Sequence, residues 1–589
     1  MKRNIWIILG LLFGLFSACE LDETPKASAT ADDIFGTENG LKTYSYSFYD
    51  NITTASNAFK GDAMADYGAV NSLNDFLVGG AYSSETSSGW TWSQLRNINH
   101  FIANCTSPNL TEEVKNNYIG IARFFRAWFY YDMVTRFGDV PWIDKPLATD
   151  DEALYAPRDS RTLVMEKVIE DLDFAYNNIS ATSSDGTTIT KWTALGLKTR
   201  IALFEGTFRK YHEDLGLKNT ANTYLQHVVD AAEELMSNGP HSLNTAQGVE
   251  LSQRQLFISD APVISEVMFA IAFSKDLAIL NDANWWWTSA TYGPRYGLVR
   301  PFINSILNSD GTPYTSRPNY KTEMFYEECA DRDSRLAQLI RTPGYKRNGV
   351  AAPPNFASHT YTGYQPIKYT LDDNYFDNGA YNTNAVPLMR YAEVLLNYAE
   401  AKAELGNLSD NDWKNTVGTL RARSGITGGI NTLPTTVDNY LKQTFFPEVN
   451  DPIILEVRRE RQVELALEGF RFNDLKRWNR GELMATMEWS GIYVPALNQL
   501  IDLDQNGTMD VVFYDGNQSA PSIAVPAGVA KVAIGGKATN FQTLTSDKHL
   551  EWFKAQKRTW YADGRQNLYP IPATAITKNN KIEQNPFWQ

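Results

Sequence analysis

The sequence predicts a mainly α-helical protein, with a loop-rich middle and short β-strands near its end. Two observations carry this prediction. Apolar residues recur at helical spacing over most of residues 32–240 and again from Tyr391 to about residue 468. Short Val, Ile and Tyr runs then alternate with Gly and Asp turns over residues 485–547, which is typical of β-hairpins.

The first 23 residues predict an exported, lipid-anchored protein. Lys2 and Arg3 precede a short apolar run that ends in small residues at Ala18, and this pattern is typical of a secretory signal rather than a spanning helix. Cys19 follows directly, so residues 1–18 resemble a lipoprotein signal peptide, and the resemblance implies cleavage before Cys19 and its acylation. An ordinary secretory signal with a chance cysteine is the alternative. Residues 19–31 read as a tether, and their first acidic residues resemble an outer-leaflet export tag.

The elements up to residue 240 form the predicted N-terminal helical part. Thr111 and the two acids after it are typical of a helix start, and Gly138 is placed to end that helix. Its aromatic residues cover more than one face, which indicates a helix buried among others. Three more amphipathic helices are expected, at residues 160–178, 192–210 and 221–237. Residues 241–589 form the second part, and loops dominate it up to residue 385.

Helical periodicity returns after the loop-rich middle. Residues 391–405 predict a helix ended by Gly406, with residues 411–423 as its partner. Alanines in the first of these helices allow close packing, as in tetratricopeptide-like pairs, although no regular 34-residue repeat is present. Residues 453–468 predict another helix, and three of its acids share one face at i, i+4 and i+8. These acids are Glu460, Glu464 and Glu468. Because arginines surround them in sequence, a scaffold ion network is favoured over a catalytic carboxylate cluster.

Four segments together resemble the SusD/RagB family of outer-membrane nutrient-uptake lipoproteins. They are residues 122–141, which begin ARFFRAW; 331–344, which begin DRDSRLA; 458–478, which end EGFRFNDLKRW; and 568–573, LYPIPA. With Cys19, the match spans the whole chain in the family's order. The resemblance implies a SusD-like fold with four divergent tetratricopeptide-like helix pairs as a scaffold. It also implies a glycan-binding protein, or in some members a peptide-binding one, that sits over a SusC-like TonB-dependent transporter in the outer membrane.

Composition restricts the partners that this chain can have. Hydrophobic residues make up 43% and charged residues 21% of the sequence, which indicates a globular protein. The formal net charge of −14 and the lack of a basic stripe exclude nucleic acid as a partner. The sequence has 15 Trp, 30 Tyr and 29 Phe, and their flat faces can stack on the apolar face of a sugar ring. For any single ring, core packing is the alternative.

Motifs of enzymes are largely missing from the sequence. The six histidines have no H-E-x-x-H arrangement, and no G-x-S-x-G elbow occurs. We therefore expect no catalytic residues and no required cofactor, although a pair of glycosidase carboxylates cannot be recognised from sequence. Cys105 and Cys329 are expected to be buried thiols, with a disulfide as the alternative.

One segment resembles a calcium-binding loop. Asp502, Asp504, Asn506, Thr508 and Asp510 place oxygen atoms at positions 1, 3, 5, 7 and 9, with glycine at position 6, as at the start of an EF-hand loop. Position 12 is a phenylalanine, so the usual closing glutamate is missing. A structural Ca²⁺ site and a plain turn between strands both remain open.

Two aromatic clusters are candidates for the ligand site. The first is Trp285, Trp286 and Trp287 with Tyr292, where three successive tryptophans cannot all enter one core, so at least one is expected to be exposed beside Asn281, Asp282 and Asn284. The second is Tyr82 with Trp90, expected opposite the first, and Asp66, Tyr67 and Asn71 are expected to supply hydrogen bonds. The predicted function is capture of oligosaccharide or polysaccharide and delivery to the transporter. The alternatives are peptide capture and, from another class, a lipid-anchored glycoside hydrolase.

Overall fold

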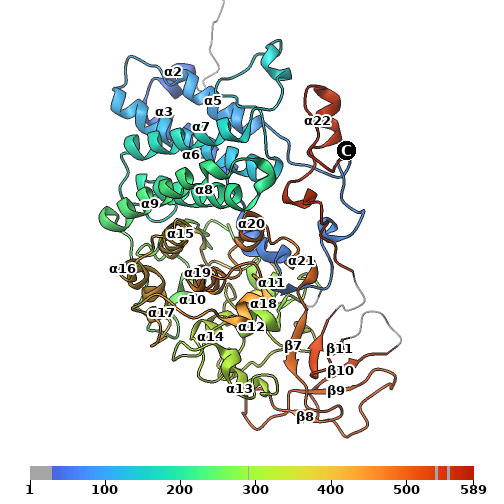
Figure 1. Cartoon of the computed structure of the whole chain (residues 1–589). Helices are drawn as coiled ribbons and strands as arrows, with labels where there is room; N and C mark the ends of the chain where they lie inside the picture. Colours follow the sequence, from blue (N-terminus) through green and yellow to red (C-terminus); the bar gives the residue numbers. More distant parts are fainter. Residues whose placement is uncertain (1–29, 290, 537–541, 553–556) are drawn as a thin grey trace, which may run out of the picture.

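The computed structural model describes residues 30–289, 291–536, 542–552 and 557–589. The predicted signal peptide and Cys19 lie outside the described residues. Most helices of the N-terminal part gather at one end of the molecule, and the C-terminal strands lie at the other (Figure 1), whereas α4 packs against the second part. The N-terminal helices are α2 (Ala31–Phe35), α3 (Glu38–Ser45), α4 (Ala55–Lys60), α5 (Ser93–Asn104), α6 (Glu112–Phe137), α7 (Arg161–Asn178), α8 (Lys191–Tyr211) and α9 (Ala221–Asn238).

Helix α6 confirms the predicted long buried helix. The Thr111 hydroxyl accepts a hydrogen bond from the Val114 N–H at its start, and Gly138 ends it with a φ of 78°, which a glycine adopts at no steric cost. Its second half is buried almost all round, because α5 and α7 pack on different sides of it. Helices α7, α8 and α9 begin and end within a residue of the predicted positions.

Helix α15 (Tyr391–Glu404) joins the two parts of the chain. It packs on α8, α9 and α19, and its alanines are buried as predicted for close helix packing. The other helices of the second part are α10 (Ser252–Ile258), α11 (Ala283–Thr288), α12 (Arg300–Ser305), α13 (Phe325–Cys329), α14 (Arg335–Leu339), α16 (Asp410–Trp413), α17 (Thr419–Arg423), α18 (Asn439–Thr444), α19 (Pro452–Glu464), α20 (Arg471–Arg477), α21 (Leu483–Thr486) and α22 (Ala573–Lys578).

Two helix predictions need correction. The expected helix at 411–423 is split into α16 and α17 by a π-helical turn at Lys414–Gly418. The expected helix at 453–468 ends at Glu464, because Leu467 and Gly469 have φ values of 66° and 84°, which no right-handed helix contains. Glu468 therefore lies in a turn and not on the helix face that carries Glu464.

The strands form small separate sheets. They are β1 (Gly68–Ala69), β2 (Val267–Ile271), β3 (Gly297–Leu298), β4 (Lys346–Arg347), β5 (Val350–Ala351), β6 (Val386–Arg390), β7 (Ser490–Tyr493), β8 (Leu500–Ile501), β9 (Val511–Asp515), β10 (Ala530–Ile534), β11 (Thr543–Leu544) and β12 (His549–Glu551). The pairs β8–β9 and β11–β12 are antiparallel, as predicted for hairpins. The prediction is wrong for β9 and β10, which pair in parallel because residues 516–529 lead the chain back to the start of β9.

Two large hydrophobic cores hold the molecule together. One lies among α5 to α9, and the other lies among the second part. Segments that are distant in sequence contribute to each core. Residues 55–77 pack in the second core. Ile571 and Ile582 pack in the first, which brings the C-terminus back beside the N-terminal helices (Figure 1). Cys105 is buried, Cys329 is half-buried, and both are free thiols, so the disulfide alternative is ruled out.

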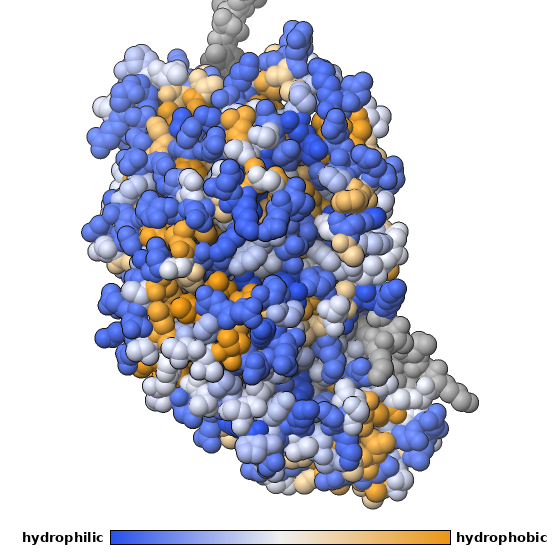
Figure 2. All heavy atoms as spheres, viewed as in Figure 1, coloured by the Kyte–Doolittle hydropathy of each residue, from blue (hydrophilic) through white to orange (hydrophobic). Residues whose placement is uncertain are grey.

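Among the described residues, no helix is both long and apolar enough to cross a membrane. On the face shown in Figure 2, apolar residues are interspersed with hydrophilic ones and form no continuous band.

Candidate functional site

Helix α11 separates the three successive tryptophans. Trp287 is buried and meets Tyr296 edge-on, with the ring centroids 5.4 Å apart. Trp285 and Trp286 are half-buried, so neither is as exposed as predicted. The reason is local: successive helical residues point about 100° apart, and a neighbouring loop covers part of each outer ring.

Tyr292 and Lys60 cover those two outer rings. The Tyr292 ring stacks on Trp285 with centroids 3.8 Å apart and an interplanar angle of 15°. The Lys60 ammonium lies 4.5 Å from the centroid of the Trp286 ring, a cation–π distance. Asp282 ties the group together, because it accepts from the Tyr292 hydroxyl at 2.5 Å and pairs with the Lys60 ammonium at 3.1 Å. Tyr292 itself is 38% exposed, so this cluster presents an aromatic ring to solvent.

Buried asparagines fix α11 in place. The Asn284 side chain accepts from the Leu371 N–H at 2.7 Å and donates to the Asp377 carboxylate at 3.2 Å. The Asn281 amide donates to the Asn384 carbonyl at 3.0 Å. The expectation that Asn281 and Asn284 lie beside a sugar is therefore wrong, since both are buried and hydrogen-bonded within the protein. Their role is to hold the tryptophans on a rigid base.

A second exposed aromatic pair, which the sequence reasoning missed, lies beside α11. Tyr375 and Tyr381 are 60% and 42% exposed, and their rings stack with centroids 5.4 Å apart. Tyr375 belongs to the 3₁₀ turn η8 (Asn374–Asp377), which contacts α11 and is fixed by a two-pronged pairing of Asp377 with Arg347. The signal in the sequence was two tyrosines in a turn-rich segment without an apolar period, which cannot bury them.

We call the five side chains Trp285, Trp286, Tyr292, Tyr375 and Tyr381 the aromatic surface. A hollow of about 750 Å³ adjoins it, with Asp282 and Ala380 on its rim and Phe269 and Phe273 among its lining residues. The aromatic surface and the hollow offer flat rings next to a concave wall, which is an arrangement that suits a chain of sugar rings.

The segment around Asp66 approaches this region but contributes little to it. Pairing of β1 with β3 brings the segment to the loop after α11, and the Asn71 N–H donates to the Pro294 carbonyl at 3.0 Å. Asn71 is exposed and stays a candidate for ligand contact. Asp66 and Tyr67 are buried: both oxygens of Asp66 accept from Arg471 at 2.7 Å, and the Tyr67 hydroxyl donates to Asp62 at 2.6 Å. The expectation that these two bind ligand is therefore wrong, because folding already uses their polar atoms.

Tyr82 and Trp90 do not lie against α11 as expected. Tyr82 meets Tyr569 and Trp588 near the C-terminus, with centroids 5.7 and 6.4 Å away. Trp90 packs edge-on against Phe137 at the end of α6. Within the described chain, neither ring contacts an aromatic residue of α11 or of the loop after it, because the buried ends of the loop carry both rings toward the N-terminal core.

The carboxylates of α19 form the predicted scaffold network. Glu464 is fully buried and accepts from Arg390, Arg423 and Arg335 at 2.6, 2.5 and 3.0 Å. Burial alone would raise the pKa of Glu464, but the three arginines hold it well below its ordinary value. Glu468 joins the network from its turn, where it pairs with Arg390 and Lys368. Each of these acids is neutralised by basic side chains, which favours a structural role over a catalytic one.

The predicted calcium loop joins β8 to β9. Ligand oxygens of Asp502, Asp504 and Asp510 lie within 4.8 Å of one another. Backbone N–H groups of Asn506 and Gly507 donate to Asp502, and the Thr508 N–H donates to the Asn506 side chain. The pKa of Asp510 is raised to about 6. Burial and the neighbouring aspartates raise this pKa, whereas the hydrogen bond from the Leu503 N–H lowers it. Three carboxylates this close repel one another, so the donor set fits a divalent cation such as Ca²⁺.

Known proteins resemble the chain over most of its length. A family model described as the SusD family matches residues 280–588. The chain belongs to the SusD family. A second model, described as starch-binding associating with outer membrane, matches residues 38–194. The family assignment confirms the resemblance read from the sequence and the expectation of a non-catalytic protein.

Individual relatives are distant in sequence and similar in fold. The SusD-like protein P2 of Formosa agariphila is 25% identical, over 82% of this chain and 92% of the relative. A SusD-like carbohydrate binding protein of Bacteroides fragilis has a TM-score of 0.68 at 18% identity, over 93% of this chain and all of the other. A further SusD-like protein of Bacteroides fragilis has a TM-score of 0.65 at 20% identity, over 95% of this chain and all of the other. The mainly helical SusD-like fold with small sheets is confirmed.

Proposed function

We propose that this SusD-family protein is a lipid-anchored protein of the outer-membrane surface that captures oligosaccharide or polysaccharide. The observation that carries the proposal is the aromatic surface, where Tyr292 and Tyr375 remain exposed although α11 and η8 beneath them are fixed by buried hydrogen bonds. Rings held rigidly lose little conformational freedom when a ligand stacks on them, which favours binding.

The chemistry of this region fits a neutral sugar chain. Stacking of a sugar's apolar face on an aromatic ring removes both from water. Polar side chains at the margin of the aromatic surface can hydrogen-bond to sugar hydroxyl groups. They are Lys60, Asp282 and Asn71. The name of one structural relative includes carbohydrate binding, and a matching family model is described as starch-binding, which supports the same ligand class.

Delivery of the ligand to a SusC-like TonB-dependent transporter is part of the proposal. It rests on the family and on the predicted lipid anchor at Cys19. In Cys19→Ala cells, we expect unprocessed precursor or release of the protein from the outer membrane. Copurification of a transporter with the wild-type protein from detergent-solubilised membranes tests the partnership, and a wild-type protein that elutes without any transporter contradicts it.

Calorimetry with neutral oligosaccharides tests the ligand class. We expect Trp286→Ala to weaken binding by about ten- to a hundredfold, by analogy with the roughly 1–3 kcal/mol of a base stacked on an aromatic side chain. Trp90→Ala is the matched control, because Trp90 packs at the end of α6 and should leave affinity unchanged. Equal affinity of wild type and a folded Trp286→Ala protein removes this tryptophan from the site.

The salt dependence of binding and a titration with peptides distinguish a glycan ligand from a peptide ligand. Binding of a neutral glycan should change little between low and high ionic strength, because its hydroxyls carry no charge to screen. Tight binding of peptides with a steep salt dependence, and none of glycans, overturns the proposal in favour of peptide capture.

A further inference from the structure

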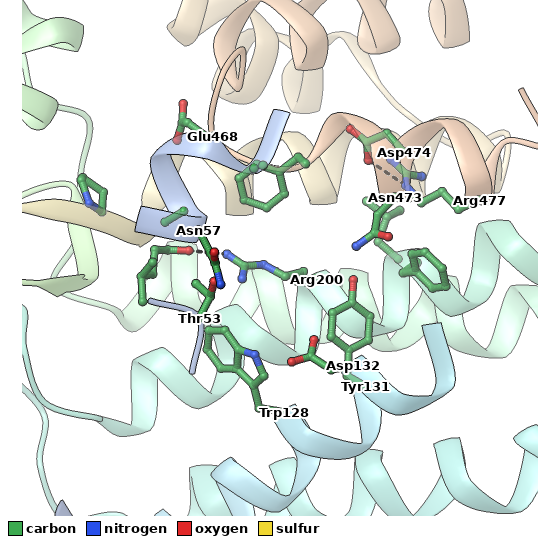
Figure 3. Close-up of a pocket in the computed structure, with 18 of the residues that line it drawn as sticks. Thr53, Asn57, Trp128, Tyr131, Asp132, Arg200, Glu468, Asn473, Asp474 and Arg477 are labelled. Atoms are coloured by element: carbon green, nitrogen blue, oxygen red, sulfur yellow. Dashed lines mark hydrogen bonds and ion pairs between the residues drawn. The ribbon is translucent and has the colours of Figure 1, made fainter. Parts of the chain in front are cut away.

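A polar recess lies between the two parts of the chain, apart from the aromatic surface. It has a volume of about 320 Å³ and is bounded by α6, α8, α4 and α20 (Figure 3). Helix α4 separates the recess from the aromatic surface, because Asn57 lines the recess whereas Lys60 contacts Trp286 and Asp282. The volume falls at the lower end of the roughly 300–1,000 Å³ typical of small-molecule sites.

The cations around the recess are already paired. Arg200 makes a two-pronged pairing with Glu393 at 2.6 and 2.7 Å, and its guanidinium also donates to the Leu388 carbonyl. Arg461 donates to Asp474 at 2.8 Å, and Arg477 pairs with Glu400. No cation of the lining is therefore left to attract an anion, which disfavours a phosphate or carboxylate ligand.

Asp132 is the exception among the charged groups of the lining. In the described part of the chain it takes part in no ion pair, and its side chain is reached by solvent inside the recess although protein surrounds it. Burial raises the pKa of its carboxyl to about 7, against Arg200 and the Trp128 indole, which lower it. Among the described residues only the Trp128 indole hydrogen-bonds to this side chain, and Asp132 is exposed to solvent in the recess, so its carboxyl oxygens remain accessible to a ligand.

Uncharged polar side chains complete the lining. Those of Thr53, Asn57, Tyr131 and Asn473 hydrogen-bond to no other residue that the structure describes. In Figure 3, Tyr131 and Asp132 rise from α6 and Asn473 descends from α20 into the same space. Trp128, Phe204 and Phe470 supply apolar walls. Amides and hydroxyls both donate and accept hydrogen bonds, whereas an ammonium ion needs acceptors alone.

We propose that this recess binds a single sugar ring, or a polyol of that size, as a site separate from the aromatic surface. The hydroxyls of a pyranose match the mixed donors and acceptors, Asp132 accepts from them in a charge-assisted bond, and the aromatic walls face the apolar side of the ring. The proposal goes beyond capture of a glycan chain and does not depend on it.

Saturation-transfer NMR and calorimetry with methyl glycosides of glucose, galactose, mannose and xylose test the proposal. At least one glycoside should bind the wild-type protein, and Asn473→Ala and Asp132→Asn should each weaken it at least tenfold. Both variants should fold, because the Asn473 side chain hydrogen-bonds to no other described residue and an amide at position 132 has nearly the same shape as the carboxyl that it replaces. Trp286→Ala should bind the same glycoside like the wild type, which separates this site from the aromatic surface.

Three results would overturn the proposal. They are no binding of any glycoside to the wild-type protein, unchanged binding by both recess variants, and loss of binding in Trp286→Ala instead. A matched titration with choline tests the ammonium alternative: binding of choline in place of the glycosides would likewise overturn a sugar site. Failure of oligosaccharide capture with intact glycoside binding would count against the aromatic surface alone.

Discussion

The ion-pair network around α19 consists of charged side chains, and the aromatic surface around α11 consists of aromatic ones. Both kinds of residue are common in functional sites. In the first, Glu460 and Glu464 are buried, and both of them and the half-buried Glu468 are paired with basic side chains. In the second, Tyr292, Tyr375 and Tyr381 retain exposed rings above a buried hydrogen-bonded base. The difference teaches that residue type does not mark a binding site. A side chain can bind a ligand only if folding leaves some of its surface or polar atoms unused.

Loss of one network carboxylate should have the largest effect on the free energy of unfolding. Glu464→Ala removes the carboxylate that three buried arginines share and leaves Arg390 and Arg423 with too few acids to balance their charge, so we expect a loss of about 3–5 kcal/mol, measured by denaturant unfolding. The matched control is Glu170→Ala, which breaks an exposed pair with Lys167 and should cost about 0–1 kcal/mol. A stable Glu464→Ala protein that has lost glycan binding would move α19 into the site and break the comparison.

Acid should weaken the buried network before it affects the aromatic surface. Burial alone would raise the pKa of Glu400, but Arg477, Arg461 and Arg458 lower it from 4.5 to about 2. Because this pKa is depressed in the folded state, its stabilisation is fully present above about pH 4.5 and is lost as the pH falls toward 2. The whole contribution is about 3 kcal/mol. The unfolding free energy of wild type should therefore fall more steeply over this range than that of Glu400→Gln, and parallel curves contradict the assignment.

The loop at 502–510 adds a third group of side chains to the comparison, since its carboxylates lack the basic side chains that neutralise the acids of the α19 network. In the described chain, no arginine or lysine pairs with Asp502, Asp504 or Asp510. If Ca²⁺ binds there, at a concentration a hundredfold above its Kd, it should stabilise the fold by about 2.7 kcal/mol. Removal of Ca²⁺ with a chelator should then lower the melting temperature of wild type but not of the Asp502→Ala, Asp504→Ala double variant. An unchanged wild-type melting temperature leaves the plain turn as the interpretation.

The smallest effect is expected at the exposed tyrosine pair. Tyr375→Ala with Tyr381→Ala removes two rings that pack mainly on each other, so affinity for the cognate glycan should fall roughly five- to tenfold, about 1 kcal/mol. The unfolding free energy should change by less than about 0.5 kcal/mol, because surface substitutions seldom cost more. Tyr155→Ala, an exposed tyrosine in the N-terminal part, is the matched control. Unchanged glycan affinity would confine the aromatic surface to α11 and its loop.

Helix positions and family were readable from the sequence because they depend on local signals. Thr111 and Gly138 mark the ends of α6 through capping and a left-handed φ, and both act within one turn of the helix. The helix of Glu464 was predicted to end four residues too late, because the break at Leu467 comes from tertiary contacts and not from a residue with a left-handed preference. The Leu467 N–H donates there to the Tyr67 hydroxyl, from 400 positions away.

Which side chains remain free for a ligand was decided by the tertiary structure alone. The sequence predicted Trp286 as a stacking ring and Asp66 as a hydrogen-bonding group of the same site, yet Arg471, 405 positions away in the chain, takes both oxygens of Asp66. Tyr375 belongs to no motif, and Asn473 lies in a family segment that indicates the fold and not a binding role. Their accessibility follows from what α11 and α6 leave uncovered around them. The sequence by itself determined the helices and the family, since those depend on neighbours along the chain. Exposure depends on packing between segments hundreds of residues apart, which no local pattern encodes.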